Sequence, residues 1–193
     1  MDPIIHKTAE VSPEAKIGQG TKIWHNSQVL AGAVIGEDCT IGHNCFIGSK
    51  AVLGNGVKLE SNIDVWDLVV LGDYVFVGPS VTFTNDLIPR AKYPKSEFPK
   101  YGKWLPTCVQ EGASLGVNAT IICGNKIGKW AMVGGGSVVT KDIPDYALFV
   151  GVPAKFIGWV CECGNRLSFK ENKAVCGVCS RSFRQEKEFV VPI

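Results

Sequence analysis

The sequence has only three histidines and two methionines among its 193 residues, and it contains no run of 18 apolar residues. A transmembrane helix needs about 20 predominantly apolar residues, so none is predicted. The net charge of +2 is too small to predict a nucleic-acid or membrane partner. The N-terminal segment also lacks the charged stretch followed by an apolar stretch that is typical of a secretory signal. We therefore expect a cytoplasmic protein.

The chain does have a strict six-residue repeat. Starting at Ile5, every sixth residue up to Phe83 is large and apolar, and after a break of 26 residues the pattern resumes at Val109 and continues to Val139. Gly often follows this lead residue, and small residues are common two positions before it, where Cys39 and Cys45 also lie. The lead positions are Ile5, Val11, Ile17, Ile23, Val29, Ile35, Ile41, Ile47, Leu53, Leu59, Val65, Leu71, Val77, Phe83, Val109, Leu115, Ile121, Ile127, Val133 and Val139.

A six-residue period fits neither a helix nor a simple alternating strand. It indicates a triangular coil, in which each hexad forms one short strand and one corner, and three hexads of about 18 residues complete a turn. The lead residue points inward, the Gly supplies backbone freedom, and successive coils stack by parallel hydrogen bonding at roughly 4.8 Å. We therefore predict an all-β parallel β-helix, with Cys39 and Cys45 as packing residues.

The repeated Ile/Leu/Val-Gly pattern resembles the left-handed β-helix of hexapeptide acyltransferases, and the hand of the coil is implied by this resemblance. We expect the β-helix to span residues 1–140, with an inserted loop at 84–108. That loop is rich in proline, aromatic and cationic residues. A long loop inside a compact repeat is usually functional, so it should pack against a neighbouring subunit or a ligand, although a merely tolerated insertion is the alternative.

The last 33 residues carry four of the eight cysteines, in two close pairs: Cys161 with Cys163, and Cys176 with Cys179. In a cytosolic chain such pairs indicate a metal site more than disulfides. Residues 161–193 are therefore predicted to form a zinc-ribbon-like appendage with a structural Cys₄ site. Zn²⁺ is the expected metal, and iron in a rubredoxin-like site is the alternative.

Six stretches resemble the bacterial UDP-2-acetamido-3-amino-2,3-dideoxyglucuronate N-acetyltransferases, and the resemblance covers roughly residues 5–160. They are residues 23–25, 77–86, 89–90, 112–116, 118–124 and 150–155. The resemblance implies acetyl transfer from acetyl-coenzyme A (acetyl-CoA) to the 3-amine of a nucleotide-linked aminosugar, in a homotrimer with sites between subunits. It does not settle whether the nucleotide is UDP or dTDP.

The same resemblance assigns residues to roles. Asn85 would orient the amine, and Asp67, one coil below it, would orient Asn85. Arg90 would meet a uronate carboxylate, or alternatively a diphosphate or a loop carboxylate. Asp86, His25 and His43 are the other candidates for substrate binding. Residues 141–160 would fold off the last coil near the coenzyme, which is expected to contact Gly116, Gly134, Ser137, Lys141 and Lys155; a solvated surface role is the alternative for Lys155.

The loop contains no histidine, and this bears on the acceptor. A hydroxyl nucleophile has a high pKa and needs a base, whereas an amine needs only to arrive neutral. A site with a poor base therefore favours N-acetylation. His25 and His43 lie 18 residues apart at one corner of successive coils, and a structural role is the alternative for both. The competing functions are O-acetylation of serine or a sugar, a non-catalytic scaffold, and a metal-dependent hydrase, which the histidine spacing disfavours.

Overall fold

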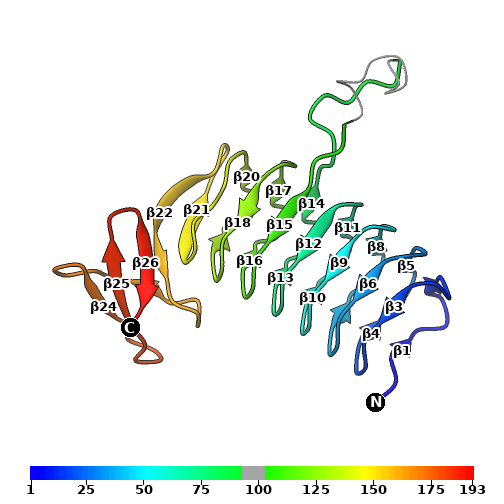
Figure 1. The fold of residues 1–193 in the computed structure, drawn as a ribbon, viewed down its shortest axis with the longest axis horizontal. Helices are drawn as coiled ribbons and strands as arrows, with labels where there is room; N and C mark the ends of the chain where they lie inside the picture. The colour runs from blue at the N-terminus through cyan, green and yellow to red at the C-terminus, as the bar shows by residue number, and fades with distance from the viewer. Residues whose placement is uncertain (93–102) are drawn as a thin grey trace.

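The computed structural model describes residues 1–92 and 103–193, and within these ranges the chain contains strands and turns but no helix. The described residues therefore contain no helix that could cross a membrane. The chain winds into an elongated solenoid, with the cysteine-containing segment at the C-terminal end (Figure 1). Residues 93–102 of the expected loop lie outside the described residues.

Three sheets run along the solenoid, one on each face, and their strands are parallel except at the C-terminal end of the first sheet. The first has ten strands, in the order β1 (Ile4–Ile5), β4 (Lys22–Ile23), β7 (Thr40–Ile41), β10 (Lys58–Leu59), β13 (Phe76–Val77), β16 (Ser114–Leu115), β19 (Met132–Val133), β21 (Ala147–Val150), β22 (Lys155–Val160) and β23 (Arg166–Leu167). The second has seven: β2 (Glu10–Val11), β5 (Gln28–Val29), β8 (Phe46–Ile47), β11 (Asp64–Val65), β14 (Thr82–Phe83), β17 (Thr120–Ile121) and β20 (Val138–Val139).

The third sheet has six strands, and a separate sheet of three closes the C-terminus. The six are β3 (Lys16–Ile17), β6 (Val34–Ile35), β9 (Val52–Leu53), β12 (Val69–Leu71), β15 (Thr107–Val109) and β18 (Lys126–Ile127). The three are β24 (Lys173–Val175), β25 (Ser182–Glu186) and β26 (Phe189–Pro192). Each strand from β1 to β17 pairs with the third strand on, which is the topology of the hexapeptide-repeat left-handed β-helix, and the predicted fold class is confirmed.

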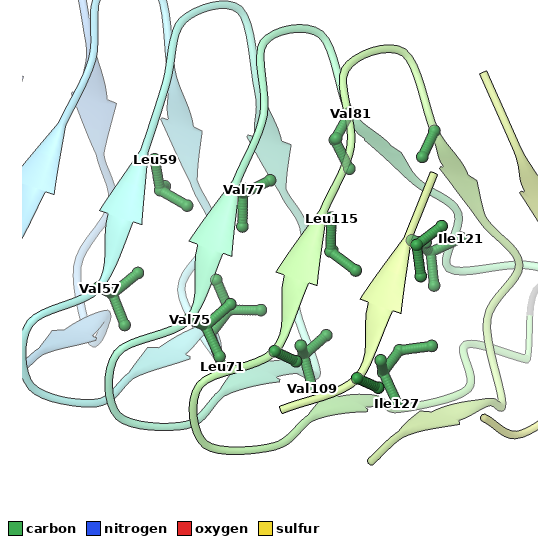
Figure 2. Packing of buried hydrophobic residues seen from close by; sticks show 14 of the residues in the cluster. Val57, Leu59, Leu71, Val75, Val77, Val81, Val109, Leu115, Ile121 and Ile127 are labelled. Carbon is green, nitrogen blue, oxygen red and sulfur yellow. The ribbon is translucent and has the colours of Figure 1, made fainter. Parts of the chain in front are cut away.

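The lead residues form the core, as predicted. From Ile23 onward they are at most 2% exposed, whereas Ile5, Val11 and Ile17 in the first coil are only partly covered. Figure 2 shows Leu59, Val77 and Leu115 stacked from coil to coil inside the solenoid. Burying one such side chain contributes about 1.5–3 kcal/mol, and the contribution recurs in every coil.

The glycine after the lead residue has a different role from the one expected. Gly36 and Gly116 do not have positive φ angles; instead, a Cβ at Gly36 would lie 2.6 Å from the Gly54 carbonyl, and one at Gly116 would lie 2.5 Å from the Gly135 nitrogen. Glycine is needed there because the next coil passes too close for a side chain. The left-handed conformation falls three positions after the lead, at residues such as Asn44 (φ 53°) and Gly56 (φ 64°).

Cys39 and Cys45 are packing residues, as predicted. Both are at most 2% exposed, and their thiols donate to the Gly54 and Glu60 carbonyl oxygens at 3.1 Å. Burial raises the pKa of Cys45 to about 11, so the reactive thiolate is disfavoured. In the preceding coil, the hydroxyl of Thr21 occupies the equivalent position and donates to the Gly36 carbonyl at 2.8 Å.

The coils continue past the expected boundary at residue 140. Ile143 pairs in parallel with Ile127, and β21 pairs in parallel with β19, so the stack runs to Val150. The chain then reverses, and β22 returns antiparallel to β21 and leads into the cysteine-containing segment.

Candidate functional site

The inserted loop leaves the solenoid after β14 and re-enters at β15, and Figure 1 shows its described ends, residues 84–92 and 103–106, projecting from the side of the coils. Its base is closed by backbone pairing: Leu105 donates to the Asn85 carbonyl at 3.0 Å, and Asp86 bridges to Trp104 in antiparallel fashion. Thr84, which sequence reasoning did not single out, accepts a hydrogen bond from the Cys123 N–H at 2.9 Å and fastens the loop to the next coil. Asn85 is thus held at a fixed, half-buried position.

Asp86 and Arg90 lie further out along the loop. The Asp86 carboxylate accepts the Ile88 N–H at 2.8 Å, which makes it a turn-forming residue. Arg90 is exposed, and its guanidinium donates to the Pro89 carbonyl at 3.0 Å. Leu87 (54% exposed) and Trp104 (48%) present apolar surface beside them. The described part of the loop therefore offers cationic and apolar groups outward from the coils.

The described hydrogen bond of Asp67 does not reach Asn85. Asp67 lies one coil before Asn85, as the sequence predicts, because β11 pairs with β14. Its Oδ1 instead accepts the Lys50 N–H at 3.1 Å, in the preceding coil, and occupies the space left by Gly48. The described hydrogen bonds of Asp67 thus point away from Asn85. Asp67 fastens a corner of the solenoid, and its role in orienting Asn85 stays a prediction.

His25 and His43 share one corner, which follows the ten-stranded sheet, whereas Asn85 follows the seven-stranded one. Backbone hydrogen bonds connect successive coils at this corner. For example, the Asn44 N–H donates to the His25 carbonyl at 3.0 Å. The His43 Nδ1 lies 2.7 Å from the Ser61 hydroxyl, and the His25 ring centroid lies 3.7 Å from that of His6. Ser61 follows His43 by one 18-residue turn, so its place on this edge follows from the spacing. Within one chain, neither histidine lies on the edge that carries Asn85.

The glycines and serine expected at the coenzyme have structural reasons to be there. Gly134 leaves room for Val150, since a Cβ there would lie 2.6 Å from its side chain, and Gly116 approaches Gly135 closely. The Ser137 hydroxyl is fully buried and accepts the Gly151 N–H at 3.0 Å. Ser137 therefore helps to close the last coil, and its contact with the coenzyme stays a prediction.

Lys141 and Lys155 both lie at the end of the solenoid with exposed side chains. The Lys141 amine is 5.8 Å from the centroid of the Phe149 ring, a cation–π arrangement. Lys155 begins β22 and pairs with Val150. Two ammonium groups at the same end of the solenoid are suited to binding phosphate.

The four predicted cysteines meet at one point. The Sγ atoms of Cys161, Cys163, Cys176 and Cys179 all lie within 4.8 Å of one another. The closest contacts are 3.4 Å between Cys161 and Cys179, and 3.5 Å between Cys163 and Cys176. Zn–S bonds of about 2.3 Å in a tetrahedron place sulfur atoms just under 4 Å apart, so the donor set fits a tetrahedral thiolate site. The one-residue separation of the first pair does not prevent convergence.

The surroundings of the cluster favour the thiolate form of Cys176 and the neutral thiol form of Cys161. Backbone N–H groups of Cys179 and Val178 lower the pKa of Cys176 to about 6, while burial raises that of Cys161 to about 12. Asn165 donates to the Cys176 sulfur at 3.7 Å, and Arg181 forms an ion pair with Glu162 at 3.2 Å. Such outer hydrogen bonds orient metal ligands and balance their negative charge.

Two family models match the chain, one in each half of the solenoid. Residues 14–49 match the bacterial transferase hexapeptide (six repeats), and residues 106–141 match the hexapeptide repeat of succinyl-transferase. Among solved structures, the acetyltransferase domain of PglB from Neisseria gonorrhoeae FA1090, in complex with acetyl coenzyme A, is 24% identical, with a TM-score of 0.51 over 81% of this chain and 58% of that chain. This likeness supports the fold.

Two curated relatives match over shorter segments. The dTDP-3-amino-3,6-dideoxy-alpha-D-galactopyranose 3-N-acetyltransferase of Aneurinibacillus thermoaerophilus is 54% identical over 78 residues, which cover 40% of each chain. The galactoside O-acetyltransferase of Lactococcus lactis is 33% identical over 85 residues, 44% of this chain and 40% of that one. The chain thus spans about two fifths of the length of these relatives. On each side of the inserted loop, the solenoid therefore carries a segment that is similar to a hexapeptide repeat of known transferases.

Proposed function

We propose that the protein transfers the acetyl group of acetyl-CoA to the 3-amino group of a nucleotide-linked aminosugar. The observation that carries this proposal is the 54% identity over 78 residues to an enzyme named for the same transfer to a 3-aminosugar linked to dTDP. The position of Asn85 at the base of the inserted loop also supports it, because the resemblance assigns the acceptor amine to this residue.

In this proposal acetyl-CoA supplies the thioester, and the residues of the chain orient the acceptor. The side-chain oxygen of Asn85 accepts a hydrogen bond from the neutral amine and directs its lone pair at the thioester carbonyl. The tetrahedral intermediate loses the thiolate, which takes up the proton of the amine, so no side-chain base is required. This agrees with the position of Asn85 on an edge that lacks a histidine within the described chain.

Two candidate substrates differ in their nucleotide and in their sugar. A UDP-linked 3-amino-uronate would place its carboxylate against Arg90, whose guanidinium forms no ion pair in the described chain and can bind a carboxylate through two parallel hydrogen bonds. A dTDP-linked 3-amino-6-deoxyhexose has no carboxylate, and Arg90 would then contact the diphosphate. Both substrates carry the amine at the same carbon, which is why Asn85 serves either.

We further propose a homotrimer in the cytoplasm, with each site between two subunits. The exposed Leu87 and Trp104 of the loop, together with the flat faces of the solenoid, support this arrangement. In a trimer, the loop of one subunit would lie against the coils of the next, and His25 or His43 could then approach the acceptor from across the interface. The assembly would be tested by the mass in solution from light scattering.

We also propose that Cys161, Cys163, Cys176 and Cys179 hold a structural Zn²⁺. Mutual Sγ distances within 4.8 Å support a single ion with no open position. Loss of one ligand should release the metal, so Cys176→Ser should reduce the zinc content measured by atomic emission to near zero. Cys108→Ser, which changes an exposed free cysteine elsewhere, is the control and should leave one zinc per chain. Full zinc occupancy in Cys176→Ser would contradict the assignment.

The transferase proposal is tested by thiol release from acetyl-CoA with four acceptors: a UDP-3-amino-uronate, a dTDP-3-amino-6-deoxyhexose, serine and maltose. We expect turnover with one aminosugar, a fall in kcat of about 100-fold in Asn85→Ala, and no change in the exposed control Gln19→Ala. Turnover with serine or maltose alone, lost in His43→Ala, would replace the proposal with O-acetylation. Failure to bind acetyl-CoA at all would favour the scaffold.

A further inference from the structure

A groove lies where the C-terminal cysteine module, residues 161–193, meets the end of the solenoid. One wall comes from the last coil and from β21 and β22, and the other from the β25–β26 hairpin. The cavity has a volume of about 380 Å³, within the range of small-ligand sites. It is lined by Lys141, Pro144, Phe149, Phe156, Trp159, Gln185, Lys187 and Glu188.

The wall on the solenoid side is aromatic. The ring centroids of Phe156 and Trp159 are 4.8 Å apart at an interplanar angle of 62°, and Phe156 and Phe149 are 6.0 Å apart. Trp159 is 8% exposed, whereas Phe156 is 46% exposed, so the Phe156 ring is the one open to a ligand. A partly exposed ring supported by a second, buried ring is a rigid platform on which a planar heterocycle can stack.

The rim of the groove carries two amines. Lys141 comes from the last coil and Lys187 from the turn between β25 and β26, and both side chains are exposed. Neither forms an ion pair within the described chain, and Glu188 is the one carboxylate in the lining. An aromatic platform bordered by two unpaired ammonium groups is complementary to a planar base that bears phosphate.

The cysteine module supplies one wall and is anchored to the other. Phe183 is fully buried and packs edge-on against Tyr146 with ring centroids 5.4 Å apart. Arg166 donates to the Ile157 carbonyl at 2.9 Å, and Cys161 follows directly after β22, the strand that bears Phe156 and Trp159. The position of the hairpin relative to the aromatic wall is therefore set by the cysteine cluster and by the packing of Phe183.

We propose that this groove binds a purine nucleotide, with the base on Phe156 and the phosphates on Lys141 and Lys187. The nucleotide could be free, or it could be the phosphoadenosine end of coenzyme A; the second source rests on the proposed acetyl transfer. Either way, the cysteine module provides half of the site, and Lys187 and Gln185 are binding residues that the solenoid alone would lack.

The test is isothermal titration of the full-length, zinc-loaded protein with adenosine 3′,5′-bisphosphate, ADP and UDP. The test variants are Phe156→Ala and Lys187→Ala. The matched controls are Phe189→Ala, an exposed ring on the same hairpin, and Lys173→Ala, an exposed amine on β24; neither lines the groove. Circular dichroism verifies that each variant is folded.

We expect the two adenine nucleotides to bind more tightly than UDP, because a purine covers more of the exposed Phe156 ring than uracil does. Affinity should fall about tenfold in Phe156→Ala, since this change removes the ring on which the base stacks, and about threefold to fivefold in Lys187→Ala, since its contact is solvent-exposed. Both controls should match the unmodified protein. Absence of adenine nucleotide binding, preference for UDP, or equal affinity in all variants would each overturn the proposal.

The KM for acetyl-CoA then distinguishes the two sources. A rise in Phe156→Ala and Lys187→Ala that parallels the loss of nucleotide affinity assigns the groove to the coenzyme. An unchanged KM together with lost nucleotide affinity assigns it to a free nucleotide. If no acceptor supports acetyl transfer, the proposed function fails, and the titrations still decide whether the groove binds nucleotide.

Discussion

Thr107 offers a test of how the solenoid satisfies its buried polar groups. Thr107 is fully buried at the point where the chain returns from the inserted loop into β15. Its hydroxyl has no hydrogen-bond partner within the described residues. A buried polar group without a partner costs about 1–3 kcal/mol. Valine has the same shape and is β-branched, so Thr107→Val should remove that cost without leaving a cavity or disturbing the strand.

We expect Thr107→Val to raise the free energy of unfolding by about 1–2 kcal/mol. For a chain of this size each kcal/mol corresponds to about 2–4 °C in the midpoint of thermal unfolding. The backbone N–H of Thr107 donates to the Leu68 carbonyl at 3.1 Å, and this bond is unaffected by the substitution. Thermal unfolding followed by circular dichroism measures the change.

Thr21→Val is the matched control, and its effect should have the opposite sign. The buried Thr21 hydroxyl donates to the Gly36 carbonyl at 2.8 Å and accepts the Cys39 N–H at 3.0 Å. Removing it leaves two buried backbone groups without a partner, so stability should fall by about 1–3 kcal/mol. If Thr107→Val lowers the midpoint as Thr21→Val does, then the Thr107 hydroxyl has a partner and the reasoning fails.

Three other changes test the core, the close approach of coils, and the C-terminal junction. Ile47→Ala, at a fully buried lead position, should cost about 2–5 kcal/mol, whereas Val52→Ala, at a 38% exposed position, should cost much less; denaturant unfolding compares the two. Gly36→Ala should lower the thermal midpoint by several degrees because its Cβ would lie 2.6 Å from the next coil, while Gly177→Ala, with no atom within 4 Å, should not. Burial raises the pKa of Tyr146 to about 12, so the folded state favours the neutral phenol. Its contribution is therefore complete below pH 10 and lost as the pH rises toward 12, and Tyr146→Phe should reduce the loss of stability measured between those pH values.

The period of the sequence was enough to predict the coil, its core and its interruption. A lead residue every six positions can be buried throughout only if each hexad forms one side of a triangle, and the pairing of Leu71 with Val109 shows that the stack resumes in register after the loop. The two cysteine pairs likewise predicted a cluster, because turn-flanked thiols can converge across different backbone separations, and the four Sγ atoms do so.

The site was less predictable, because it depends on the direction of individual side chains. The spacing predicted that Asp67 lies one coil from Asn85. It did not show that the Asp67 carboxylate accepts the backbone N–H of Lys50, in the coil on the other side. The spacing also placed Ser137 near the end of the solenoid, without showing that its hydroxyl accepts a hydrogen bond from the Gly151 N–H. A period gives the position of a residue along the coil, whereas hydrogen bonding with neighbouring coils decides which way its polar atoms face.

The sequence by itself determined the β-helix, its buried lead residues, the place of the inserted loop and the identity of the four clustered cysteines. Each of these follows from a short-range pattern that admits one burial geometry. The tertiary structure alone decided that the coils continue to Val150, and that the hairpin bearing Lys187 faces Phe156 and Trp159 across a groove. Those features depend on contacts between segments far apart in the chain, such as Phe183 on Tyr146, and no local period encodes them.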